Sequence, residues 1–284
     1  MGLCPKPRKL LKKLDQNFNV LYNIYMERKS ILITRFIYIF TAIIIISISI
    51  WRAESIRSAA LPVSLVEHHE TIYIDGDNSA YNLPLKEMFD RIVYIDAGHG
   101  GIDPGVTRGG VYEKDINLAV ALMVYDLLLE CFSGIHPVMS RFDDSAVNRY
   151  RRAEEGSRYA DMIVSIHCNS FSMAGVRGTE TYFDRNQILG TNNRLVVTSM
   201  ELAEIMQRNI VEISGFNDRG ARNIHDFGME FVITTAPTVP SVLVELGYMS
   251  NPDELVWLTS PHYQGLLAVG IYKGILEVFG FGAN

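Results

Sequence analysis

From residue 91 onward, short apolar runs alternate with segments whose apolar and polar residues recur at helical spacing. The apolar runs predict strands, namely RIVYIDA (91–97), IHPVMSR (135–141), DMIVSIHCN (161–169), GTETYF (178–183) and SVLVELGYM (241–249). The segments between and after them predict helices, at 113–130, 146–160, around 197–213 and about 261–279. This alternation predicts an α/β fold with a mixed, twisted sheet of about six strands flanked by helices.

A different pattern fills residues 31–51, ILITRFIYIFTAIIIISISIW, where Arg35 is the only charged residue. As a helix, this run would be about 31 Å long, which matches a hydrocarbon core of about 30 Å. The seven Lys and Arg residues in 1–30, against two acidic residues, predict that the N-terminus is cytoplasmic. The predicted order is a basic cytoplasmic tail (1–30), a transmembrane signal anchor (31–51), a juxtamembrane stalk (52–90) and one catalytic domain (91–284).

The alternative to an anchor is a secretory signal cleaved near the small residues Ser58–Ala60. Charged residues at positions 52, 54 and 57 separate that motif from the apolar run, which favours a retained anchor. Both interpretations place the domain outside the cytoplasm.

Charge and cysteine content narrow the functional class. Behind the overall net charge of −6, the chain after residue 30 carries 19 basic and 30 acidic residues, which argues against a nucleic-acid partner. Hydrophobic residues make up 48% of the chain, ample for a buried core. Cys4, Cys131 and Cys168 are odd in number and irregular in spacing, so they indicate neither a disulfide framework nor a thiolate metal site.

The loop after the first strand, GHGGIDPG (98–105), holds His99 between glycines. It lacks the spacing of a phosphate-binding loop. Together His99, Glu113 and His167 offer two imidazoles and a carboxylate, a common ligand set of catalytic zinc. Considered singly, Glu113 is better explained as a charge at a helix N-terminus, and His167 as a core histidine. The other five histidines are left out of this metal set.

Glu245 ends an apolar strand, where an unpaired carboxylate is costly. Desolvation would raise its pKa, which suits a general base, whereas a salt bridge to an arginine such as Arg219 is the structural alternative.

The segment RRAEEG (151–156) predicts a solvated helix face with ion pairs at i,i+3 and i,i+4. The segment DRGAR (218–222) is equally explained as a contact for a substrate carboxylate or as a surface turn.

Four segments, IDAGHGGIDPG, YEKDINL, ADMIVSIHCNS and PSVLVELGYMSNPDE, resemble in this order the signatures of zinc-dependent N-acetylmuramoyl-L-alanine amidases. The similarity runs from about residue 92 to 279. It implies Zn²⁺ bound by His99, Glu113 and His167, and a catalytic Glu245. The implied reaction is hydrolysis of the amide bond between N-acetylmuramic acid and L-alanine in peptidoglycan.

An anchor followed by a bare catalytic domain resembles the sporulation-associated, germination-specific members of that family. This implies a substrate in spore cortex or cell wall, and leaves open an activating protein partner. Cys168 stands where many relatives have alanine, and a small buried residue is expected there. Two other functions are weighed: a silent peptidoglycan-binding scaffold on the same fold, and a zinc peptidase that cuts stem peptides.

Overall fold

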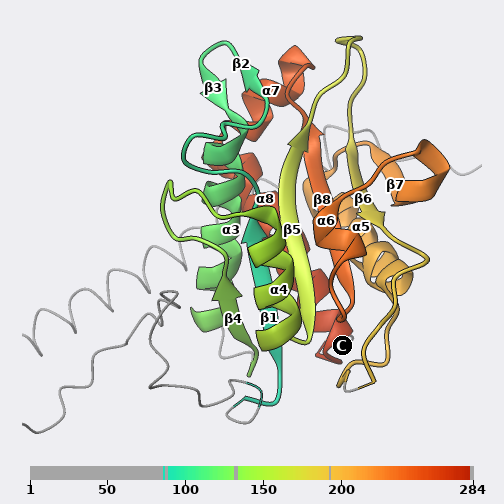
Figure 1. Ribbon diagram of the computed structural model, residues 1–284. Coiled ribbons are helices and arrows are strands. Elements are labelled where there is room, and N and C mark those ends of the chain that lie inside the picture. Colours follow the sequence, from blue (N-terminus) through green and yellow to red (C-terminus); the bar gives the residue numbers. More distant parts are fainter. Residues whose placement is uncertain (1–85, 87–88, 131–133, 192, 282–284) are drawn as a thin grey trace, which may run out of the picture. The chain divides into compact units, whose positions relative to one another are not determined.

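The computed structural model describes Lys86 and residues 89–130, 134–191 and 193–281 (Figure 1). The expected anchor and nearly all of the expected stalk lie outside these residues, as do Cys4 and Cys131. Within the described part of the chain, no helix is both long and apolar enough to cross a bilayer.

Six strands form one sheet in the order β4-β1-β5-β8-β6-β7. The first four are parallel, β6 runs antiparallel to β8, and β7 is parallel to β6. The strands are β1 (Ile92–Ala97), β4 (His136–Met139), β5 (Met162–Asn169), β6 (Thr179–Phe183), β7 (Asp218–Asn223) and β8 (Ser241–Tyr248). The predicted mixed six-stranded sheet is therefore confirmed.

The central strands are apolar on both faces because helices cover both faces of the sheet. In β5, Val164 and Ile166 join the larger core under α3, α5 and α8, while Ile163 faces the smaller core under α4 and α6. The helices are α3 (Glu113–Glu130), α4 (Arg149–Tyr159), α5 (Ser199–Ser214), α6 (Val232–Thr235), α7 (Pro252–Leu258) and α8 (Pro261–Val278). Figure 1 shows α4 and α6 on the near face of the sheet and α3, α5 and α8 behind it.

Helix starts follow the expected capping chemistry. The side chain of Asn148 caps α4, and Asn251 caps α7 directly before Pro252. Thr198 and Glu201 form a reciprocal capping box at the start of α5. The caps of α4 and α5 place these helix starts within three residues of the predicted positions, whereas α7 was not predicted.

Several elements differ from the sequence-based expectation, among them the unpredicted short helices α6 and α7. Residues 218–223 form the edge strand β7, so a surface turn at DRGAR is wrong. A short hairpin, β2 (Thr107–Arg108) and β3 (Val111–Tyr112), lies between the glycine loop and α3 and was not predicted. The two hairpin strands have only two residues each, and β7 is polar and only partly buried, so none of them has the apolar run that marks a core strand.

Candidate active site

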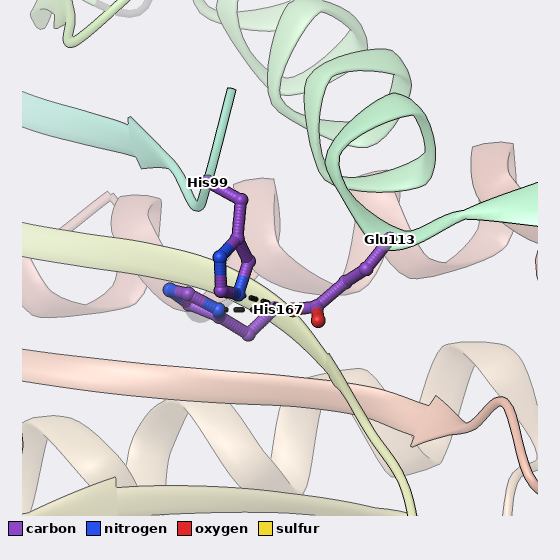
Figure 2. Close-up of side chains that lie close together, drawn as sticks. All are labelled: His99, Glu113 and His167. Carbon is purple, nitrogen blue, oxygen red and sulfur yellow. Dashed lines mark hydrogen bonds and ion pairs between the residues drawn. The ribbon is translucent and has the colours of Figure 1, made fainter. Parts of the chain in front are cut away.

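His99, Glu113 and His167 meet at the carboxyl end of the parallel strands, and their ligand atoms all lie within 4.8 Å of one another. His99 follows β1 by two residues, Glu113 is the first residue of α3, and His167 lies within β5 beside β1. Figure 2 shows the three side chains pointing toward one another from these separate elements. The structure thus brings together the three residues predicted as metal ligands.

The Glu113 carboxylate lies between the two imidazoles. Its Oε1 is 3.2 Å from Nε2 of His99 and 3.0 Å from Nδ1 of His167. The same oxygen accepts a hydrogen bond from the backbone N–H of Cys168, and Oε2 accepts one from Val106. Burial alone would raise the pKa of Glu113, but the hydrogen bonds from His167 and His99 outweigh it and hold the pKa well below its ordinary value. Glu113 is therefore anionic and contacts both imidazoles through one carboxylate oxygen.

The donor chemistry of this cluster fits zinc, since two imidazoles and a carboxylate are a common catalytic ligand set. Asp103 adds support, because its Oδ2 lies 2.8 Å from the second ring nitrogen, Nδ1, of His99. A carboxylate in that position fixes the orientation of a ligating imidazole and increases its basicity. The site therefore carries both the ligands and an outer partner expected of a zinc centre.

The backbone at His99 is strained. Its φ is +60°, the only positive φ outside glycine among the described residues. Arg152 donates a hydrogen bond to the His99 carbonyl, and Arg141 donates to the carbonyls of Ala97 and Gly98. Strain of this kind persists only where the surroundings over-determine the conformation. Two buried arginines thus hold the loop that presents His99.

The glycine before His99 is required by a close approach. A Cβ at Gly98 would lie 2.3 Å from ring atoms of His167. We expect Gly98→Ala to displace this imidazole and lower the hydrolysis that the family resemblance implies by about 100-fold, as a misplacement of about 1 Å does at a catalytic site. Dye release from labelled peptidoglycan, the substrate that the resemblance implies, measures the loss. Gly175→Ala is the matched control, because a Cβ there meets nothing within 4 Å, and equal activity of the two variants would contradict the prediction.

Glu245 lies beside His167 in the sheet. Its Cα pairs with His167 across β5 and β8, so both side chains are on one face of the sheet. The residue is 8% exposed, and its Oε2 has no hydrogen-bond partner among the described residues. Burial, and then the charges of Glu113 and Glu180, raise its pKa well above the ordinary value. The proposed salt bridge to Arg219 is wrong, because Arg219 pairs with Glu180 instead.

Several supporting residues were missed from the sequence. Arg152 was assigned to a solvated helix face, but it is 5% exposed and pairs with buried Asp96, whereas Arg151 and Glu155 do form the expected i,i+4 pair. A helical repeat cannot tell which of two adjacent arginines faces the core. Arg141 lies two residues after β4, within the run IHPVMSR that predicted this strand, which was the available signal for burial. Cys168 is buried in the core as expected, and burial raises its thiol pKa well above the usual range.

Comparison with known proteins decides the family. A family model for N-acetylmuramoyl-L-alanine amidase matches residues 93–277, a range that contains all four proposed site residues. The chain belongs to the N-acetylmuramoyl-L-alanine amidase family. As a member it is a hydrolase that acts on peptidoglycan.

Individual relatives agree with this assignment. The germination-specific amidase of Bacillus subtilis is 30% identical over 214 residues, covering 70% of this chain and 83% of that protein. The catalytic domain of CwlV from Paenibacillus polymyxa superposes with a TM-score of 0.59 at 33% identity, covering 68% of this chain and 99% of that domain. The Clostridioides difficile amidase CwlD, solved in complex with the GerS lipoprotein, gives a TM-score of 0.54 at 30% identity over 66% of this chain and 98% of that one.

Proposed function

We propose that this amidase is zinc-dependent, with the metal held by His99, Glu113 and His167 and with Glu245 as the catalytic acid–base group. The observation that carries the proposal is the meeting of two imidazoles and an anionic carboxylate beside a buried carboxyl group with an unpartnered oxygen. When bound there, zinc would supply Lewis acidity toward the substrate carbonyl and lower the pKa of water.

The chain's own residues then divide the work. Asp103 holds Nδ1 of His99 so that Nε2 faces Glu113. Burial raises the pKa of Glu245, and a cation held by the neighbouring residues would oppose this effect and favour its carboxylate form. Glu245 takes a proton from the attacking water and delivers it to the nitrogen of L-alanine as the amide bond breaks. One carboxyl group thereby acts first as base and then as acid.

Digestion of purified peptidoglycan tests this function. The protein is assayed with added zinc and after chelation, and the products are identified by mass spectrometry. We expect zinc-dependent release of intact stem peptides that begin with L-alanine, leaving the lactyl carboxylate on the glycan. Cleavage within the stem peptides would indicate a peptidase, and zinc binding without release would indicate a silent scaffold.

The metal ligands have a separate test. His167→Ala should lose bound zinc as measured by elemental analysis, because it removes one of three ligands. His136→Ala is the matched control, since His136 lies at the start of β4 and stacks on Phe89, away from the cluster. Equal zinc content in the two variants would remove His167 from the ligand set.

We also propose that residues 31–51 retain the enzyme in a membrane with its catalytic domain outside the cytoplasm. The apolar run and the basic residues before it support this orientation. Membrane fractionation with N-terminal sequencing of the mature protein tests it. A soluble product that starts after Ala60 would show that the segment is a cleaved signal.

A role in spore cortex or cell-wall remodelling, with the help of a protein partner, completes the proposal. It is supported by the name of the germination-specific relative and by the CwlD relative solved with a lipoprotein. Comparing digestion of spore cortex and vegetative wall by the purified enzyme, alone and with extracts of sporulating cells, tests both points.

A further inference from the structure

A second buried carboxylate lies beside Glu245. Glu180 of β6 is opposite Glu245 of β8 in the antiparallel pair, and it is 0% exposed. Three neutral donors and two guanidinium groups bind its carboxylate, from Asn169, Tyr182, Tyr248, Arg219 and Arg222. These contacts outweigh burial and lower the pKa of Glu180, so it is anionic. His167, Glu245 and Glu180 thus form a row across three adjacent strands.

Arg219 and Arg222 carry two positive charges, whereas Glu180 carries one negative charge. Arg219 uses only Nε and Arg222 only Nη1 to bind Glu180, and their side chains are 29% and 20% exposed. No other hydrogen bond of either guanidinium is found within the described part of the chain. Glu254 is also near Arg219, but its two oxygens accept backbone N–H groups of Gly178 and Tyr248. One positive charge and several N–H donors therefore remain for a ligand.

Both guanidinium groups are also held in place. Arg219 lies 5.0 Å from the ring centroid of Tyr248, and Arg222 lies 3.9 Å from that of Phe227. Glu180 also accepts a hydrogen bond from each arginine. The two side chains therefore have little conformational freedom left to lose when they bind an anion. Fixed arginines with free N–H groups match the planar geometry of a carboxylate.

We propose that Arg219 and Arg222, fixed by Glu180, bind a carboxylate of the substrate's peptide next to the scissile bond. This inference rests on the proposed function, which sets the attack beside Glu245. Adjacent strands are about 4.8 Å apart, and an extended peptide advances about 3.5 Å per residue. Arg219 and Arg222 belong to β7, two strands from Glu245, but their guanidinium groups bind Glu180 of β6, one strand from Glu245. A carboxylate bound by these groups therefore belongs to the residue that follows L-alanine. The carboxylate of that residue is the ligand.

Two soluble substrates test the inference on the wild-type, full-length enzyme with zinc. One is N-acetylmuramoyl-L-alanyl-D-glutamate, and the other is the same compound with both glutamate carboxyls converted to carboxamides. We expect kcat/KM to be at least about tenfold higher for the acid, because hydrogen bonds to a charged group are lost in the amide. Equal values would overturn the subsite while leaving the amidase function intact. Cleavage of neither would overturn the proposed function and the subsite with it.

The variant Arg219→Gln tests whether Arg219 and Arg222 cause the preference for the acid substrate. Arg222 still pairs with Glu180 in this variant, so the buried carboxylate keeps a cation. We expect the variant to lose the preference for the acid, so that its kcat/KM values for the two substrates converge. Arg185→Gln is the control, since Arg185 is exposed and pairs with Asp226. Equal loss on both substrates would indicate a structural role for Arg219 and would overturn the proposal.

Discussion

Replacing Glu245 by glutamine is expected to lower amidase turnover by about 10² to 10⁴-fold, the range that a positioned general acid–base group contributes. The amide has nearly the same shape as the carboxyl group, so it fills the same space in β8. It can neither accept the proton of water nor return it to the L-alanine nitrogen. The measurement is kcat for release of stem peptides from purified peptidoglycan, at saturating zinc.

Two controls separate chemistry from folding in this variant. Burial raises the pKa of Glu245 in the metal-free protein, so the carboxyl is uncharged over a wider pH range and a neutral amide replaces it without leaving a buried charge unpaired. We therefore expect Glu245→Gln to unfold at the same denaturant concentration as the wild type and to bind one zinc. Glu204→Gln, an exposed change on α5, should retain full activity. Substantial turnover by Glu245→Gln would remove Glu245 from the acid–base role.

The parts of the fold that the sequence pattern predicts are those with a continuous apolar signal. β1 and β8 are buried along their whole length, β5 is buried at its first five residues, and the helix predicted at 113–130 coincides with α3. Strand β7 escapes prediction because DRGARN is polar and lies at a sheet edge, where one side of the strand has no partner. The antiparallel direction of β6 relative to β8 depends on the route that the chain takes between strands, and no local sequence pattern predicts that route.

Some residues of the candidate site are likewise recognisable in the sequence, and others are not. His99 and Glu113 are recognisable because glycines and a helix start mark their positions, and their meeting with His167 follows from the carboxyl ends of adjacent parallel strands. The residues beneath them are not recognisable, because their roles arise from packing. Glu180 reads as one charge within TETYF, and only the sheet register sets it opposite Glu245. For the same reason, the salt bridge to Arg219 that was weighed as the alternative for Glu245 is formed by Glu180.

Arg152 shows how a buried residue that the sequence pattern does not reveal contributes to folding stability. Its Nη1 lies 2.6 Å from Oδ1 of Asp96, and the other oxygen of Asp96 accepts the hydroxyl of Ser165. Burial would raise the pKa of Asp96, but Arg152 and then His167 and the hydrogen bonds outweigh it and lower the pKa. Because the pKa is lowered on folding, the pair contributes stability above the unfolded value of about 3.9, and this stability is lost as the pH falls through the folded value.

Arg152→Met is accordingly expected to lower the free energy of unfolding by about 3–5 kcal/mol at pH 7, because it leaves Asp96 buried without its cation. Urea denaturation monitored by circular dichroism measures the change. Arg151→Met is the matched control on the same helix turn, where a half-exposed pair with Glu155 contributes only about 0.5 kcal/mol. A loss in Arg152→Met no larger than that of the control would contradict the structural role.

The double variant Asp96→Asn with Arg152→Met separates buried charge from support of the catalytic loop. Removing both charges should recover much of the lost stability, since the penalty comes from the unpaired carboxylate. Activity should not recover with it, because Arg152 also donates the hydrogen bond to the carbonyl of His99, whose left-handed backbone needs that restraint. A double variant that regains both stability and turnover would show that Arg152 only balances charge. One that regains stability alone would show that this arginine positions a metal ligand.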